Sequence, residues 1–299
     1  MNYESGQSKS WIMLTLSMVL FGTIGICRRF ILLPSDVLAC GRGIMGGVFL
    51  LLVLKAGGQR FRLEQIRRKS FFLLVLSGVL IGMNWILLFE AYNYTTVAVA
   101  TLCYYMQPVI VILLSPVILK EKMKGKQILC AAVSVTGMVL VSGAAGGGAM
   151  QNPKGIALGL GAAVLYASVV IMNKCITGFP ALEKTIIQLF SAAAVMLPYM
   201  AVSGTLHTYE LPVLGIILFL VVGVVHTGIA YAMYFASIEH LPARTCALMS
   251  YIDPVTAVIL SALFLQEKMG ISGIIGTILI IGSAIVSEMS ESEEMEKVS

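Results

Sequence analysis

The sequence contains few charged residues. Only 12% of its 299 residues are Asp, Glu, Lys or Arg, whereas 58% are hydrophobic, and the mean hydropathy is +0.93. A soluble domain of this length carries a polar exterior, which lowers such averages. The composition therefore excludes an ordinary soluble domain and predicts an integral membrane protein, with the lipid bilayer as its solvent.

Several functional motifs are also missing. The six cysteines show no CxxC spacing, the three histidines form no HExxH, and neither GxSxG nor GxxxxGK[ST] occurs. These absences give no support to a metal site, a cofactor, a catalytic nucleophile or ATP-driven transport. The position of the charges also argues against nucleic-acid binding. We predict that the protein is not an enzyme and that its cysteines are small buried residues.

Charges, glycines and prolines divide the chain into ten apolar stretches. Each approaches the length of about 20 residues that a helix needs to cross the hydrocarbon. We predict spans at 11–28, 35–54, 71–92, 96–119, 126–143, 155–174, 182–203, 211–236, 243–265 and 270–288. The predicted fold class is an all-α integral membrane protein with ten transmembrane helices.

The basic residues predict the orientation. With ten spans, 15 of the 20 Lys and Arg residues fall on the amino-terminal side, four fall on the other side, and Arg42 lies within a span. Basic loops stay in the cytoplasm. We therefore expect a multi-pass protein of the plasma membrane with both termini in the cytoplasm.

An internal repeat divides the chain into two halves. A shift of 146 residues lays residues 88–123 on residues 234–269, with 11 identical pairs in 36 positions. The predicted parts are a first repeat at 1–143, an external Gly-rich linker at 144–154, a second repeat at 155–288 and an acidic cytoplasmic tail at 289–299. Because each half holds five spans, the halves are predicted to be inverted around a central cavity.

Two segments carry a family resemblance. YYMQPVIVILLSPVILKEK and MSYIDPVTAVILSALFLQEK each place a proline inside a span and Glu-Lys at its end, and Arg42 follows the first hairpin. This pattern resembles the drug/metabolite transporter superfamily, and within it the EamA-type permeases. The resemblance implies transport of small metabolites through a cavity lined mainly by spans 3, 4, 8 and 9, with help from spans 1 and 6.

The candidate site lies near the middle of the membrane. Asp253 is about ten residues into its span, which is roughly 15 Å deep, and an intramembrane carboxylate is a functional candidate. Helical spacing places further residues at similar depth on equivalent faces. The predicted substrate-binding residues are Asn84, Trp85, Tyr104, Gln107, His226, Tyr231, Ser250, Asp253 and Thr256.

Some of these residues have structural alternatives. Pro108 and Pro254 lack an N–H and are expected to kink their helices. A protonated Asp253, or Gln107, could instead satisfy a neighbouring backbone group or hold two helices together. Arg42 could anchor its span, pair with an acid or contact substrate. Asp253 and His226 are titratable, so proton coupling through them is a hypothesis.

We therefore expect a secondary transporter of small polar metabolites that works by alternating access. One intramembrane arginine suits amino acids or amines better than phosphate esters, and the resemblance favours export. A multidrug or other metabolite permease of the same fold and a non-transporting membrane sensor are the alternatives. The predicted partners are a small-molecule substrate and the bilayer, with protons as a candidate coupling ion and no nucleic acid.

Overall fold

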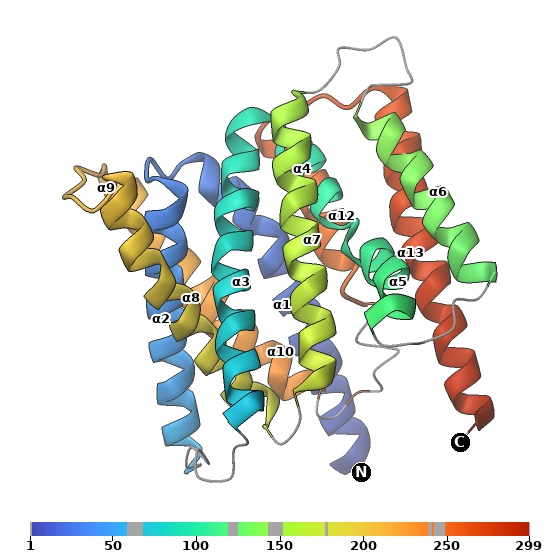
Figure 1. The fold of residues 1–299 in the computed structure, drawn as a ribbon, viewed down its shortest axis with the longest axis horizontal. Helices are drawn as coiled ribbons and strands as arrows, with labels where there is room; N and C mark the ends of the chain where they lie inside the picture. Colours follow the sequence, from blue (N-terminus) through green and yellow to red (C-terminus); the bar gives the residue numbers. More distant parts are fainter. Residues whose placement is uncertain are drawn as a thin grey trace.

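The computed structural model describes residues 2–58, 68–118, 125–142, 152–176, 179–238, 241 and 249–298. These residues form helices and connections, with no β-strand among them. Figure 1 shows the helices side by side in a bundle, with both ends of the chain at the same end of it. Most of the predicted linker, up to residue 151, lies outside the described residues, as does Cys246.

The helices follow one another along the chain with short connections. The first half contains α1 (Asn2–Arg29), α2 (Ser35–Ala56), α3 (Arg68–Tyr94), α4 (Val97–Tyr104), α5 (Gln107–Ile118) and α6 (Gly125–Val141). The second half contains α7 (Pro153–Cys175), α8 (Ala181–Ser203), α9 (Val213–Leu220), η2 (Val221–Ile229), α10 (Ala230–Ile238), α12 (Ile252–Phe264) and α13 (Ile271–Val298).

Six of the predicted spans are helices long and apolar enough to cross a membrane. They are Lys9–Arg29, Ser35–Ala56, Arg68–Tyr94, Pro153–Asn173, Ala181–Ser203 and Val213–Ser237. The other four predicted spans correspond to shorter apolar helices, at Val97–Val111, Ile128–Val141, Ile252–Phe264 and Ile271–Val286. The count of ten spans therefore stays a prediction.

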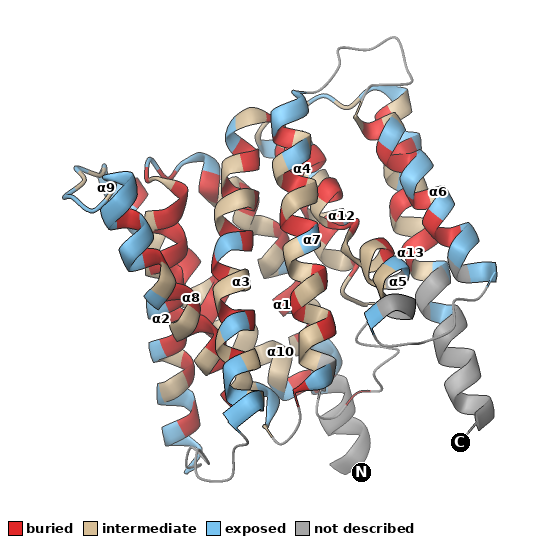
Figure 2. Ribbon diagram, in the orientation of Figure 1, coloured by how far each residue is buried: buried red, intermediate tan, exposed pale blue. Residues whose placement is uncertain are grey.

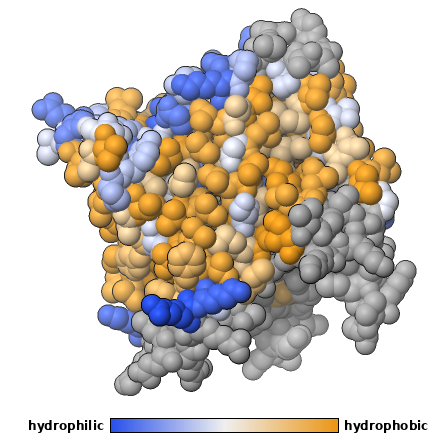
Figure 3. All heavy atoms as spheres, viewed as in Figure 1, coloured by the Kyte–Doolittle hydropathy of each residue, from blue (hydrophilic) through white to orange (hydrophobic). Residues whose placement is uncertain are grey.

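The surface fits a lipid environment. Buried residues face the interior of the bundle, while exposed residues lie on its outer faces and at its ends (Figure 2). The outer faces carry many large apolar side chains, including Leu52, Phe72 and Ile278. Figure 3 shows an apolar band across the visible face, with hydrophilic residues gathered at its upper and lower edges.

Two predicted spans are interrupted rather than kinked. α4 ends at Tyr104, two residues in a turn follow, and α5 begins at Gln107, so Pro108 lies in the first turn of a new helix. Pro254 likewise lies in the first turn of α12. Proline is tolerated there because the N–H groups of a first turn have no partner within the helix. The carbonyl that Pro254 frees, on Ser250, accepts the Asp253 N–H at 3.3 Å.

The helix of the eighth predicted span contains a π-helical segment. η2 covers nine residues between α9 and α10. Hydrogen bonds in a π-helix join residues five apart, so side chains four apart no longer lie one turn apart. The faces that a regular helix would present are therefore rotated in this segment.

Each half packs mainly on the other. α3 packs on α7 and α8, whereas α1 packs on α10 and α12, and α2 packs on α8 and η2. α6 and α13 form a separate pair, joined by the Ser134 and Ser283 hydroxyls at 2.6 Å. The interior of the bundle is therefore built from both halves.

Cysteine burial differs from the prediction at one described position. Cys40, Cys103 and Cys130 are buried as expected and Cys27 is half-buried, but Cys175 is exposed. Cys175 is the last residue of α7.

Close helix packing depends on glycine at Gly78. A Cβ there would lie 2.6 Å from the backbone oxygen of Gln188 and 2.9 Å from its Cα, both in α8. Backbone atoms cannot move away as a flexible side chain could, so α3 and α8 approach closely only because this position has no side chain.

We therefore expect Gly78→Ala to lower stability by roughly 1–3 kcal/mol through overpacking. Gly282→Ala is the matched control, because a Cβ there meets nothing within 4 Å and alanine favours a helix. Apparent melting temperatures of the two detergent-solubilised variants measure the difference. Equal temperatures would contradict the close approach of α3 and α8.

Candidate functional site

A cavity of about 440 Å³ lies between the helices of the two halves. Its lining comes from α1, α2, α3, α4, α5, α7, α8, α10 and α12, from the turn between α4 and α5, and from Ser250 just before α12. This volume is in the range of small-molecule sites. The cavity extends to Asn173, Ala181 and Lys184, at the connection between α7 and α8.

Aromatic side chains dominate the lining. Six tyrosines contribute to it, at 92, 104, 105, 166, 231 and 234, together with Trp85 and three phenylalanines. The rings of Tyr104 and Tyr166 lie 5.6 Å apart, and those of Phe21 and Tyr231 lie 5.2 Å apart, edge to face. These contacts join α4 to α7 and α1 to α10. Aromatic faces attract cations, and their hydroxyls supply hydrogen bonds.

Asp253 brings a carboxylate into this aromatic lining. The Tyr105 hydroxyl donates a hydrogen bond to Asp253 Oδ2 at 2.5 Å. Tyr105 follows the end of α4, and Asp253 lies in the first turn of α12. Within the described part of the chain, no basic side chain forms an ion pair with this carboxylate.

Arg42 brings a guanidinium from α2. Its Nε donates to Thr227 Oγ1 at 3.1 Å, and its Cζ lies 4.0 Å from the ring centroid of Trp85. The side chain is 5% exposed and lines the cavity, and no described carboxylate pairs with it. Its Nη atoms form no hydrogen bond among the described residues. The cavity therefore contains a guanidinium and a carboxyl group that are not paired with each other.

The π-helical segment fixes the position of Arg42. Thr227 Oγ1 donates to the Val222 carbonyl five residues earlier, at 2.9 Å, so its lone pairs remain to accept Arg42 Nε. This donation depends on the i to i−5 geometry of η2.

Polar groups line the cavity near the α7–α8 connection. Gln188 Nε2 donates to Ser77 Oγ at 2.8 Å and to Asn173 Oδ1 at 2.9 Å. Lys184 Nζ donates to the Ile176 carbonyl at 2.7 Å. These groups make this end of the cavity more polar than its aromatic middle.

Comparison with known proteins supports a transport role. Two parts of the chain, residues 8–143 and 153–289, each match the EamA-like transporter family. Together the two matches cover nearly the whole sequence. The chain belongs to the EamA-like transporter family. It is therefore a multi-pass membrane protein of a family of transporters.

Bacterial members of this family resemble the chain over most of its length. The transporter YxxF of Bacillus subtilis (strain 168) is 25% identical over 276 residues, which are 92% of this chain and 88% of YxxF. Protein RarD of Escherichia coli (strain K12) is 26% identical over 239 residues, 79% of each chain. Protein PecM of Dickeya dadantii (strain 3937) is 28% identical over 217 residues, 72% of each chain.

A solved structure shares the fold. A crystal structure matches this EamA-like chain with a TM-score of 0.66 at 20% identity, covering 94% of this chain and 98% of the other. At this identity the match concerns the fold alone.

The structure brings six of the predicted site residues to the cavity. They are Trp85, Tyr104, Gln107, Tyr231, Ser250 and Asp253. The buried Oε1 of Gln107 has no hydrogen-bond partner within the described residues. Their roles in binding stay predictions.

Three predicted residues lie outside the lining. Asn84 is fully buried and donates to the Ala162 carbonyl at 2.5 Å, which joins α3 to α7. The His226 Nε2 lies 2.6 Å from Thr23 Oγ1, which joins η2 to α1. Thr256 lies where α12 packs on Gly22 of α1. The expected face of His226 assumed a regular helix, and η2 rotates it.

Sequence reasoning missed four of the lining tyrosines, namely Tyr92, Tyr105, Tyr166 and Tyr234. For Tyr105 a signal existed, because Tyr105 and Tyr251 are identical in the repeat. The turn after α4 places Tyr105 against Asp253, whereas a continuous helix would not. Arg42, for which the sequence leaves an anchor, a partner for an acid and a substrate contact open, lies in the lining.

We expect Thr227→Val to lower stability by about 1–3 kcal/mol, because the buried Arg42 Nε loses its acceptor. Thr227→Ser keeps the hydroxyl and is the matched control. Apparent melting temperatures in detergent measure both variants. A valine variant as stable as the serine variant would show that Thr227 does not hold Arg42.

Proposed function

We propose that this chain is a secondary transporter of small polar metabolites, and that amino acids or amines are its substrates. The observation that carries the proposal is the cavity itself, in which Arg42 and Asp253 both contribute to an aromatic lining without pairing with each other. Unpaired buried charges are costly, so a ligand that neutralises them binds with a gain. Family membership supports transport rather than catalysis.

The charges favour particular substrates. The Asp253 carboxylate and the surrounding tyrosines suit an ammonium group, which binds both carboxylates and aromatic faces. The Arg42 guanidinium suits a carboxylate. An amino acid offers both groups, whereas an amine offers only the first.

Alternating access between two inverted halves is the proposed mechanism. The packing of α3 on α7 has its counterpart in the packing of α1 on α10, and α5 on α7 has its counterpart in α12 on α1. Exchange of equivalent contacts is what two related halves around one site provide. We place the domain boundaries at 1–143 and 155–288, on either side of the linker.

Orientation and coupling belong to the same proposal. The distribution of Lys and Arg supports cytoplasmic termini in the plasma membrane. The cavity then extends toward the cytoplasm, at the α7–α8 connection, where an exporter takes up its substrate. If protons drive transport, Asp253 is the group that we assign to coupling, since the His226 ring contacts Thr23 instead of lining the cavity.

Flux into proteoliposomes tests the proposal. Purified protein is assayed under a pH gradient with labelled amino acids, each compared with the amine that has the same side chain but no carboxylate. We expect Asp253→Asn to lower flux of both compounds at least about tenfold, because each loses a charge-assisted hydrogen bond. Arg42→Gln should lower flux of the amino acid much more than that of the amine.

Glu210→Gln is the control, since this exposed residue lies between α8 and α9, away from the cavity lining. Saturable binding without flux would favour a membrane sensor. Equal flux of unrelated hydrophobic cations in the parent and in Arg42→Gln would favour a multidrug permease. Full flux in Asp253→Asn, with unchanged pH dependence, would remove Asp253 from both binding and coupling.

A further inference from the structure

Two carboxylates hold α4 and α12 together, one at each end. The two helices pack on each other. Glu267, just after α12, contacts the start of α4, whereas Asp253, in the first turn of α12, contacts Tyr105 just after the end of α4. The helices are therefore antiparallel. We call this arrangement, formed by Arg29, Glu267, the first turn of α4, Tyr105 and Asp253, the α4–α12 clasp.

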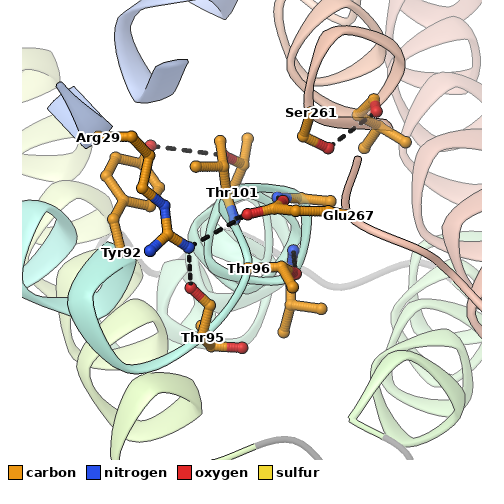
Figure 4. Close-up of polar contacts among 11 residues, drawn as sticks. Arg29, Tyr92, Thr95, Thr96, Thr101, Ser261 and Glu267 are labelled. Carbon is orange, nitrogen blue, oxygen red and sulfur yellow. Dashed lines mark hydrogen bonds and ion pairs between the residues drawn. The ribbon is translucent and has the colours of Figure 1, made fainter. Parts of the chain in front are cut away.

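The Glu267 end combines an ion pair with a helix cap. Glu267 Oε2 accepts the Val97 N–H at 2.9 Å and the Ala98 N–H at 3.4 Å, and Oε1 accepts Arg29 Nη2 at 3.1 Å. Arg29 Nη2 also donates to the Thr95 carbonyl at 2.7 Å. Figure 4 shows the Arg29 and Glu267 side chains meeting beside Thr95 and Thr96. Carboxylates are favoured at a helix N-terminus, where N–H groups lack partners.

A strained turn after α12 directs the Glu267 side chain toward α4. Gln266 adopts a φ of 52°, in the left-handed region that costs a non-glycine residue energy. The Glu267 N–H then returns to the Ser261 carbonyl at 3.3 Å. This turn directs the carboxylate back toward α4 instead of continuing α12.

This end of the clasp lies at the end of the bundle opposite the α7–α8 connection, which the cavity lining reaches at Asn173 and Lys184 (Figure 1). Arg29 is the last residue of α1, so the contact ties α1, α4 and α12 together. Tyr92 and Thr101, drawn beside it in Figure 4, also line the cavity, and their hydroxyls lie 3.4 Å apart. The ion pair therefore lies beside two residues of the cavity lining, on the side away from the α7–α8 connection.

The cavity end of the clasp is the Tyr105–Asp253 hydrogen bond. From Val97 to Tyr105 the chain rises about 12 Å, all within α4 except at its last residue. Such a short helix moves as one body, so its two ends shift together. Loss of the contact at Asp253 thereby also displaces the start of α4 from Glu267, which lies 14 positions further along the chain.

We propose that the α4–α12 clasp is the gate on the Arg29 side of the cavity, and that breaking the Tyr105–Asp253 hydrogen bond releases it. A cationic group of the substrate that takes the Asp253 carboxylate displaces the Tyr105 hydroxyl, a step that rests on the proposed function. The open state then binds this cation better, because Asp253 no longer shares its charge with Tyr105. Differential affinity of this kind is what allows a ligand to shift a conformational equilibrium.

Distances between spin labels test the gate without any substrate. Labels are attached to Phe30→Cys and Phe264→Cys, two exposed positions next to Arg29 and at the end of α12, in a background without native cysteines. Double electron–electron resonance in lipid nanodiscs gives the distance distribution. We expect the parent to show mainly a short distance, and Glu267→Gln to raise the ratio of long to short distances about tenfold.

The variants at the cavity end are decisive. The same hydrogen bond is removed in two ways, at its donor in Tyr105→Phe and at its acceptor in Asp253→Ala. If one variant misfolds, the other still tests the coupling. Both should populate the same long distance as Glu267→Gln, although neither residue contacts the labels. Glu210→Gln, an exposed neutralisation away from α1, α4 and α12, should match the parent.

Each outcome has a definite meaning. If Glu267→Gln has the same distance distribution as the parent, the ion pair does not close the cavity and the proposal of a gate is wrong. If Glu267→Gln opens but both cavity-end variants match the parent, coupling along α4 is wrong. The result is separable from the proposed function, because a clasp that opens as expected in a protein without flux would overturn only the latter.

Discussion

Arg42 and Asp253 carry opposite charges inside a bundle whose outer faces are apolar, and burying such charges costs several kcal/mol each unless polar groups surround them. In this structure, different polar and aromatic groups offset the cost of burying Arg42 and the cost of burying Asp253. The Arg42 guanidinium lies against the Trp85 ring and donates a hydrogen bond to Thr227. The Asp253 carboxylate accepts a hydrogen bond from the Tyr105 hydroxyl. The π-helical segment and the turn between α4 and α5 place Thr227 and Tyr105 where these contacts form. Two irregular segments of the described backbone, η2 and the turn after α4, therefore lie at these two residues.

The sequence allowed the regular parts of this structure to be predicted. Apolar length located the helices, and six of them are long enough to span a membrane. Asp253 was recognisable because a carboxylate in an apolar run requires a polar environment. The repeat singles out Tyr105 but not its contact with Asp253, because that contact depends on α4 ending at Tyr104. His226 was misplaced for a related reason, because helical periodicity assumes i to i−4 hydrogen bonding, which η2 does not have. Local departures from regular geometry leave little trace in hydropathy.

Position determines what an acidic group does, as Asp253 in the first turn of α12 and Glu267 just after its end illustrate. Asp253 lies in an aromatic cavity and accepts one hydroxyl, so much of its charge is available to a ligand. Glu267 accepts two backbone N–H groups and an arginine, so its charge is used within the protein. Its repeat mate Glu121 lies outside the described residues. Glu267 itself joins three helices, because it follows α12, pairs with Arg29 at the end of α1 and accepts N–H groups at the start of α4.

The packing of each half on the other has a consequence for biosynthesis. The first half enters the membrane before α7, η2 and α10 have been translated. At that stage Asn84 has no Ala162 carbonyl to bind, and Arg42 has no Thr227 hydroxyl. The nascent chain must therefore satisfy these polar groups with water, lipid headgroups or the insertion machinery until the second half arrives. Assembly of the interior is thus completed late in translation, and a truncated chain keeps an intramembrane arginine without its native partners.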